Sequence, residues 1–227
     1  MVSVLAFDTA GNGCSAAVLR DGRLAAHRFA AMARGQSERL LPMIEAVLAE
    51  AAIAIDALDL IAVTVGPGAF TGLRIGIAAA RGLALASGVP ALGITSFVAV
   101  AAQVPAEARA GRTLVVALDS RRAELYLEAF GADGVPLGDG ALVAPAALAH
   151  WVPPGPLLLA GDAAPVLAAA LPGRHVDVAR GPGIADAADV ARLAAAAWRP
   201  GLRPAPPRPL YLRAPDTTAP RQAAASR

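Results

Sequence analysis

Short apolar runs separated by turn residues open the chain and predict a group of strands. The runs at residues 2–7, 14–19 and 23–29 are divided by Ala10-Gly11-Asn12-Gly13 and by Asp21-Gly22. Asp-Gly tolerates the positive φ angles of a tight hairpin, and short apolar runs bounded by such turns are typical of strands. We therefore expect three strands here, with residues 14–19 and 23–29 paired as a hairpin.

Apolar positions then recur at helical spacing in two longer segments. Residues 37–51 carry apolar side chains three and four positions apart, and Pro42 is expected to delay or bend the start of that helix. Strand 60–65, a glycine-rich loop, helix 72–86 and strand 91–94 follow, and Thr95-Ser96 is a candidate cap for a helix through Gln103. This alternation predicts a parallel or mixed sheet covered on both faces.

The second half repeats the opening pattern. It predicts strands at 114–118, 124–130, 157–160 and 175–179 and helices at 163–171 and 187–198. Phe7-Asp8-Thr9 and Leu118-Asp119-Ser120 each end an apolar strand that a returning strand follows, and a Gly-Pro-Gly triplet stands in each half. These echoes favour a two-lobed α/β fold, with lobes at 1–108 and 109–198 and a tail at 199–227.

Composition and charge narrow the setting. The chain is 56% hydrophobic, so it has ample apolar surface for a core, and a single cysteine, Cys14, without a signal peptide fits a reducing cytoplasm. The long uncharged stretches 82–106 and 140–161 are broken by Gly and Pro, so we expect no membrane span. Residues 199–227 hold six Arg against one acid. This tail is either a solvated segment or an electrostatic arm for nucleic acid or an acidic partner.

Two acidic residues and one glycine-rich loop are the candidates for a functional site. Asp8 and Asp119 end strands, where α/β folds place ligands, so they could hold a magnesium–phosphate unit or merely cap their own turns. The loop Gly66–Gly72 opens a helix and could cradle an anion together with Arg74, although it lacks the Lys-Ser/Thr pair of a Walker loop.

A stripe of small residues gives the second long helix another reading. Gly72, Gly76, Ala80 and Ala84 are spaced four apart and share one face, which permits close approach by the chain's own sheet or by a second subunit. The spacing does not decide between the two. Metal and nucleophile motifs are missing from the sequence, since the three histidines are far apart and no Ser lies in a GxSxG elbow.

Four motifs together resemble the TsaB family, the dimerisation subunits of the bacterial machinery that makes threonylcarbamoyladenosine in tRNA. They are Leu5-Ala6-Phe7-Asp8-Thr9, Gln36-Ser37-Glu38-Arg39-Leu40-Leu41-Pro42, the block GPGAFTGLRIG at 66–76, and Pro209-Leu210-Tyr211-Leu212-Arg213. Ala117-Leu118-Asp119-Ser120-Arg121-Arg122 adds to the match, whereas residues 131–197 carry little of it. Gln36 stands where many members have His, so it is assigned no role.

The resemblance implies an actin-like, sugar-kinase-like two-lobed fold and a cytoplasmic protein. It also implies a non-catalytic subunit, because Ser96 and Val100 stand about where the catalytic relative TsaD carries its metal-binding HxxxH pair. By the same resemblance, the chain has no cofactor of its own, and ATP and a divalent metal act in partner subunits. The implied partners are TsaD and TsaE, with a second copy as an alternative partner and with tRNA bound indirectly or through the basic tail.

The resemblance further resolves the small-residue stripe toward an intersubunit role. Helices 37–51 and 72–86 are the family's pairing elements. The predicted partner interface comprises Leu40, Leu41, Ile44, Val47, Gly72, Leu73, Gly76, Ala80 and Arg81. The predicted vestigial nucleotide or anion site comprises Asp8, Thr9, Gly66, Gly68, Thr71, Arg74 and Asp119. The alternative function is an ATP- and magnesium-dependent phosphotransferase or ATPase of the same fold that uses Asp8 and Asp119.

Overall fold

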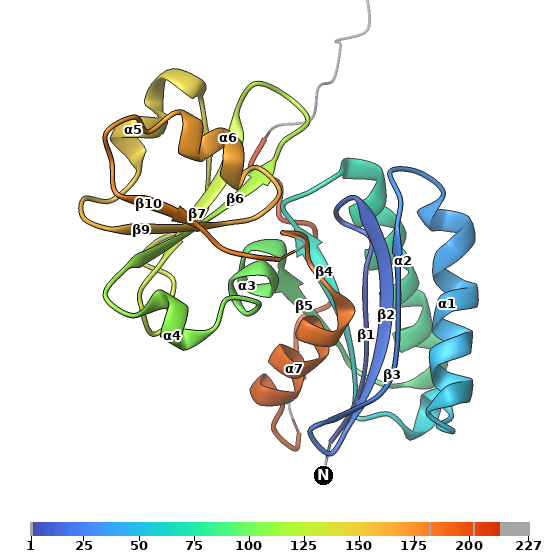
Figure 1. Cartoon of the computed structure of the whole chain (residues 1–227). Helices are drawn as coiled ribbons and strands as arrows, with labels where there is room; N and C mark the ends of the chain where they lie inside the picture. The colour runs from blue at the N-terminus through green and yellow to red at the C-terminus, as the bar shows by residue number, and fades with distance from the viewer. Residues whose placement is uncertain (1, 182, 202, 214–227) are drawn as a thin grey trace, which may run out of the picture.

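The chain forms two five-stranded mixed sheets that lie side by side, as the computed structural model in Figure 1 shows. The structure describes residues 2–181, 183–201 and 203–213. Within these residues, no helix has the length and apolar character needed to cross a bilayer. The predicted two-lobed α/β fold class is confirmed.

The first sheet has the strand order β3-β2-β1-β4-β5. Its strands are β1 (Ser3–Asp8), β2 (Gly13–Arg20), β3 (Arg23–Ala31), β4 (Leu60–Gly66) and β5 (Ala91–Thr95). The predicted hairpin joins β2 to β3, and both Asp21 and Gly22 have positive φ, at 51° and 76°. β1 and β4 pair in parallel at the centre, where residues buried on both faces account for their continuous apolar runs.

Helices cover both faces of the first sheet. Two long helices, α1 (Gln36–Glu50) and α2 (Phe70–Ser87), pack on one face with Leu40, Ile44 and Ile77 in the core. On the other face, α7 (Ala187–Ala197) packs against β1, β2 and β4. The sequence division places this helix in the second lobe; the structure instead packs it on the first sheet, to which the chain returns after the second.

The second sheet has the order β8-β7-β6-β9-β10. Its elements are β6 (Thr113–Asp119), β7 (Leu125–Phe130), β8 (Ala141–Val143), β9 (Leu157–Ala160) and β10 (Val176–Val178). The short helices of the described chain are α3 (Ser96–Ala101), α4 (Ala106–Arg109), α5 (Leu148–Trp151) and α6 (Ala164–Ala169). Single 3₁₀ turns lie at Ile55–Ala57 and Pro145–Ala147. The three-residue strand β8 and the short helices α4 and α5 were not predicted.

The two sheets share one topology. In each sheet, counting strands in chain order, the first and second strands pair antiparallel, and so do the second and third. The first and fourth strands pair in parallel, and so do the fourth and fifth. β6 therefore corresponds to β1 and β9 to β4. The echo between Asp8-Thr9 and Asp119-Ser120 reflects this correspondence, because each pair ends the equivalent strand.

Two details of the helices differ from the sequence expectation. Pro42 lies inside α1, which already begins at Gln36, so proline neither delays the helix nor ends it. The second long helix begins at Phe70, two residues before the predicted start. The predicted cap at Thr95 is confirmed, since its hydroxyl accepts a hydrogen bond from the Val98 N–H at 3.2 Å.

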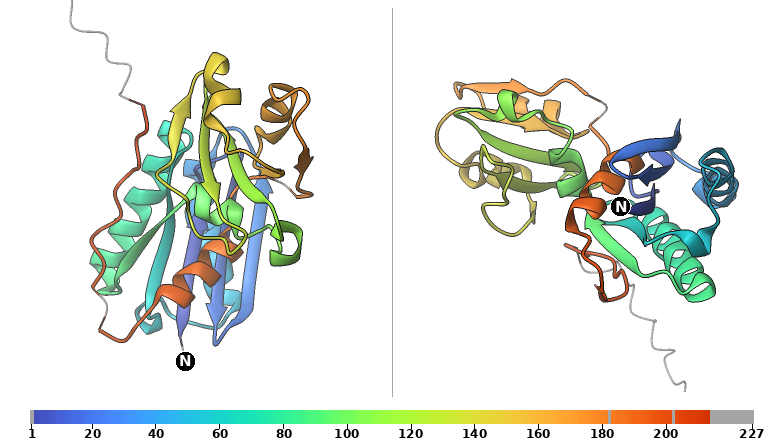
Figure 2. Two further views of the ribbon diagram at one scale, coloured as in Figure 1. Left: turned by 90° about the vertical axis from the view of Figure 1, so that its left-hand side faces the viewer. Right: turned by 90° about the horizontal axis from the view of Figure 1, so that it is seen from below.

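The part of the tail that the structure describes, residues 203–213, runs alongside α2 and reaches the second sheet (Figure 2). We call this segment the strap. Arg81 donates to the Pro207 carbonyl at 2.8 Å, and the Leu210 N–H donates to the Val65 carbonyl at 2.7 Å. At its end, Arg213 pairs with Glu124 of the second lobe at 3.0 Å. The strap therefore ties the two lobes together. The rest of the predicted tail, 214–227, lies outside the described residues.

Candidate functional site

The carboxyl end of β1 carries Asp8, which is fully buried. Its Oδ1 accepts hydrogen bonds from the Thr64 hydroxyl and from the Ala10 N–H, the latter at 3.1 Å. Its Oδ2 is buried and has no partner in the described structure. Burial removes water from the carboxylate and raises the pKa of Asp8 to about 6. Asp8 is thus a buried turn residue, as the alternative sequence reading holds.

The glycine loop between β4 and α2 packs on the chain itself. The Ala69 N–H, which could otherwise face an anion, donates to the Ala10 carbonyl at 2.8 Å. A Cβ at Gly68 would overlap the Ala10 carbonyl oxygen, and a Cβ at Gly72 would overlap that of Thr9. These glycines therefore serve the close approach of two backbone segments. Thr71, in the first turn of the helix, is exposed.

Asp119, the counterpart of Asp8 in the second lobe, is occupied by its own turn. Its Oδ1 accepts from the Arg121 N–H at 2.7 Å, and its own N–H donates to Asp162 Oδ1 at 2.9 Å. Arg121 also reaches across to the Asn12 side chain of the first lobe. Burial raises the pKa of Asp162 above its usual value. Arg121 thereby spans the space between the lobes.

The pocket beside Asp119 is small. It measures about 30 Å³, has Gly68, Ser96, Asp119 and Arg121 among its walls, and is not lined by Asp8. Pockets for organic ligands usually measure about 300–1,000 Å³. Of the predicted nucleotide site, Gly68 and Asp119 line this pocket, whereas Thr71 and Arg74 are exposed on α2. The predicted residues as arranged do not fit a magnesium–phosphate unit.

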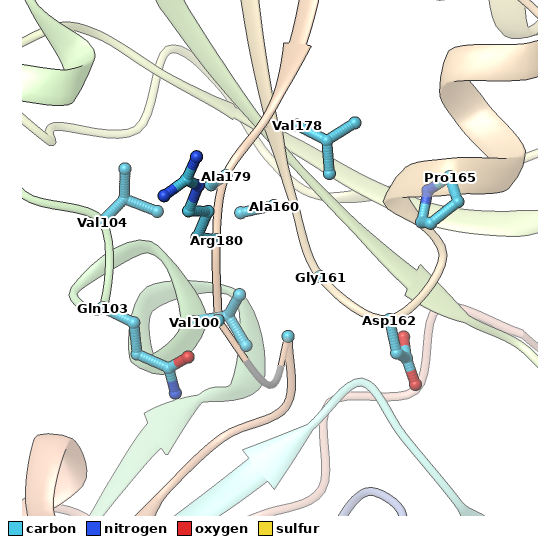
Figure 3. Close-up of a pocket in the computed structure, with 12 residues that line it drawn as sticks. Val100, Gln103, Val104, Ala160, Gly161, Asp162, Pro165, Val178, Ala179 and Arg180 are labelled. Carbon is cyan, nitrogen blue, oxygen red and sulfur yellow. The ribbon is translucent and has the colours of Figure 1, made fainter.

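A larger pocket of about 210 Å³ lies beside α3 and the loops that follow β9 and β10 (Figure 3). Its wall is apolar around Val100 and Ala160, with Gln103, Asp162 and Arg180 at the edges. The Gln103 amide donates to the Ile184 carbonyl at 2.7 Å and so fixes the start of the segment that returns to the first lobe. Sequence reasoning did not identify this pocket.

The helix that would correspond to a metal-binding helix is α3. Ser96 is buried with an unpartnered hydroxyl, and Val100 is a buried core residue. Across the described ranges, no group of three or more His, Cys, Asp or Glu residues is placed to hold a metal ion. His27, one of the three histidines, instead pairs with Asp186 at 2.9 Å.

Most of the predicted partner interface is buried in the chain's own core. The buried members are Leu40, Ile44, Val47, Gly72, Leu73, Gly76 and Ala80. A Cβ at Gly76 would press on Thr9 and Val63, so the small-residue stripe serves the chain's own sheet. The predicted contact of this stripe with a second subunit stays a prediction. Of the predicted set, Leu41 is 50% exposed and Arg81 is exposed, with its guanidinium on the strap.

A different face of the same helices is open. On α2, Ala78, Gly82 and Leu85 are exposed and spaced at i, i+4 and i+7, so they share one face. Leu85 is 88% exposed, and a Cβ at Gly82 would meet nothing within 4 Å. α1 packs beside α2 and exposes Leu41. We call Ala78, Gly82 and Leu85 the open face.

An exposed aromatic cluster forms where the strap meets the start of α2. The Phe70 and Tyr211 rings lie 5.7 Å apart at an interplanar angle of 30°. The Arg74 guanidinium lies 3.7 Å from the Phe70 ring centroid, and its Nε donates to the Tyr211 hydroxyl at 3.3 Å. Sequence reasoning quoted Phe70 and Tyr211 only as parts of two separate motifs. Arg74 therefore belongs to this cluster and makes no contact with Asp8.

Comparisons with known proteins agree with the two-lobed fold. The family model of TsaD, tRNA N6-adenosine threonylcarbamoyltransferase, matches residues 30–159. YeaZ from Pseudomonas aeruginosa aligns with a TM-score of 0.79 and 30% identity over 93% of this chain and 100% of that one. An uncharacterized protein of Mycobacterium tuberculosis (strain ATCC 25618 / H37Rv) is 38% identical over 94% of this chain and 93% of its own length.

A curated relative with a stated process matches a shorter part. The tRNA threonylcarbamoyladenosine biosynthesis protein TsaB of Escherichia coli (strain K12) is 37% identical over 123 residues, which are 54% of this chain and 52% of that protein. The family model's match over residues 30–159 includes α1, the glycine loop and α2.

Proposed function

The chain belongs to the TsaB (YeaZ) family, and we propose that within tRNA threonylcarbamoyladenosine biosynthesis it is a non-catalytic scaffold. Its role in that process follows from the family. Its proposed task is to hold a TsaD-family subunit in a competent arrangement, with a TsaE-type ATPase docking on the pair. Transfer of the threonylcarbamoyl group to adenosine then takes place on the partner.

The open face carries this proposal. Leu85 at 88% exposure is an apolar side chain that a partner would cover, and Ala78 and Gly82 beside it are small enough to let a partner helix approach closely. Leu41 is a further exposed apolar side chain, on the neighbouring helix α1. An exposed apolar helix face suits helix-to-helix pairing with a related subunit. A second copy of this chain could present the same face, so a homodimer competes with the heterodimer.

The geometry around Asp8 and Asp119 supports the non-catalytic part of the proposal. The pocket beside Asp119 measures about 30 Å³ and is not lined by Asp8, and each of the two carboxylates accepts a backbone N–H of its own turn through Oδ1. We therefore propose that ATP and the divalent metal act in the partner subunits. The phosphotransferase alternative would need Asp8 to face a nucleotide, and no observation in the structure favours it.

The test is co-purification of the tagged chain with a TsaD-family subunit from the same cell. We expect Leu85→Asp and Gly82→Trp to abolish pairing while the circular dichroism spectrum stays unchanged, because both positions face outward. Val166→Asp is the matched control: this valine is 58% exposed on α6, away from the open face. Undiminished pairing of both open-face variants would contradict the proposed interface.

A reconstituted modification assay tests the role itself. We expect threonylcarbamoyladenosine to form only when this chain, the TsaD-family subunit and the TsaE-type ATPase are all present with tRNA, and we expect the isolated chain to give no turnover of ATP. ATP-dependent turnover by the isolated chain that Asp8→Asn removes would favour the phosphotransferase.

A further inference from the structure

The cluster of Phe70, Arg74 and Tyr211 is not used by the proposed pairing surface. Phe70 is 45% exposed and Tyr211 is 41% exposed, although the two rings and the Arg74 guanidinium already contact one another. The cluster is held from two sides: Phe70 begins α2, and Tyr211 follows Leu210, whose N–H donates to Val65 in the first sheet. Two half-exposed rings are therefore fixed in place, and the Arg74 guanidinium lies over one face of Phe70.

The charged side chains of α2 and the strap, which form the cluster, are all positive. α2 and the strap together contain no Asp or Glu, and they carry five arginines, Arg74, Arg81, Arg203, Arg208 and Arg213. Glu124 of the second lobe offsets one of them by pairing with Arg213. The positive end of the α2 dipole lies at Phe70 as well. This surface suits a polyanion better than a neutral or mixed protein surface.

We propose that the Phe70–Arg74–Tyr211 cluster is a stacking site for an unpaired RNA base, with Arg74 and Arg208 facing the adjoining phosphates. The choice of tRNA as the RNA rests on the proposed function. Aromatic rings bind bases through their faces, which are accessible only where bases are unstacked, so the site takes a single-stranded loop rather than a duplex. Arg74 adds a planar cation beside the ring and a charge for the backbone.

The experiment measures binding of an unmodified tRNA transcript to the purified complex of this chain with the TsaD-family subunit. Phe70→Ala and Tyr211→Ala each remove one ring, and Phe70→Trp keeps a stacking surface. Phe29→Ala is the matched control, because Phe29 is 41% exposed on β3, outside the cluster. Co-purification of every variant with the partner is measured first and tests the pairing separately.

We expect Phe70→Ala and Tyr211→Ala to weaken tRNA binding by about 5- to 150-fold each, the range found for removal of one stacked ring. Phe70→Trp and Phe29→Ala should bind as the unchanged complex does. Arg74→Gln should lower the salt dependence of binding by about 0.7 in the log–log slope, the value of one phosphate contact to a single strand. A duplex RNA of equal length should compete poorly.

Three results would overturn the proposal. The first is unchanged tRNA binding by both ring variants, or no binding of tRNA by the unchanged complex. The second is loss of partner co-purification by the ring variants, which would make the cluster a protein contact. The third is equal competition by the duplex, which would leave only a phosphate interaction. Failure of the proposed pairing itself is visible separately, in the Leu85→Asp and Gly82→Trp variants.

Discussion

Thr9 and Gly72 hold the first strand against the start of α2. The Thr9 hydroxyl donates to the Gly72 carbonyl at 2.7 Å, and the Thr9 carbonyl oxygen occupies the space where a Cβ of residue 72 would lie. The two backbones therefore approach as closely as glycine permits. This contact gives Gly72, the last residue of the glycine loop, a packing role within the chain.

Gly72→Ala should destabilise the fold strongly, whereas the same change at Gly82 in the same helix should stabilise it. At residue 72 the added methyl meets rigid backbone, so we expect a loss of about 3 kcal/mol in the free energy of unfolding. At residue 82 the methyl meets open space, and replacing a helical glycine by alanine contributes about 0.5–1 kcal/mol. Urea denaturation followed by circular dichroism measures both. Equal effects at the two positions would contradict the packing role of Gly72.

Local turn and cap chemistry made part of the fold predictable. Asp21-Gly22 specified a hairpin because few residues accept its positive φ angles, and Thr95 specified a helix start because its hydroxyl can accept a first-turn N–H. Strand β8 was missed because three residues, Ala141–Val143, are too few to show an alternation. The sheet on which α7 packs was not predicted, because the apolar face of a helix does not indicate which surface it packs against.

The candidate site was less predictable because its decisive contacts join distant parts of the chain. Small residues at Gly72, Gly76 and Ala80 suit close approach by any neighbour, and only the fold shows that the neighbour is the chain's own first sheet. Phe70 and Tyr211 are 141 positions apart and meet only because the strap returns along α2. Sequence spacing carries no information about such a contact.

Asp8 should make the stability of the protein fall as pH rises through the weakly acidic range. Its pKa is raised from 3.8 in a model peptide to about 6 in the fold, so the folded chain binds this proton more tightly than the unfolded chain does. Stability from this group is present below about pH 4 and is lost by about pH 6, an effect of on the order of 3 kcal/mol. Asp8→Asn should remove this part of the pH dependence in denaturation curves measured from pH 4 to pH 8.

Glu128 provides a second, separable titration. Burial, assisted by the nearby charge of Asp139, raises the pKa of Glu128 from 4.5 to about 7. Its contribution to stability is present below about pH 4.5 and is lost as pH rises to about 7, so Glu128→Gln should flatten the curve at higher pH than Asp8→Asn does. If each substitution left the pH dependence unchanged, neither carboxyl would bind its proton more tightly in the fold.

Cys14 should be inert in the native protein. The side chain is fully buried in β2, and burial raises the pKa of its thiol to about 11, so the reactive thiolate is scarce at neutral pH. We expect labelling by a thiol-specific disulfide reagent at pH 8 to be at least about 100-fold slower in the native chain than in urea-denatured chain, because modification must wait for opening of the strand. Rapid labelling without denaturant would contradict the placement of Cys14.

Asp186 should stabilise the packing of α7 on the first sheet through two interactions. Substitution by Asn and substitution by Ala distinguish the two. Its Oδ1 caps α7 by accepting from the Ala188 N–H at 2.7 Å, and its carboxylate pairs with His27 of β3. Asparagine is a good cap but carries no charge, so Asp186→Asn should remove only the partly exposed ion pair and cost less than about 1 kcal/mol. Asp186→Ala removes both interactions and should cost about 1 kcal/mol more, the usual value of a lost cap.

His27→Ala should reproduce the Asn variant, and the double substitution His27→Ala with Asp186→Asn should add little to either. Urea denaturation at pH 6 measures all four. A loss from Asp186→Asn as large as that from Asp186→Ala would show that the ion pair, and not the cap, holds α7 on the first sheet.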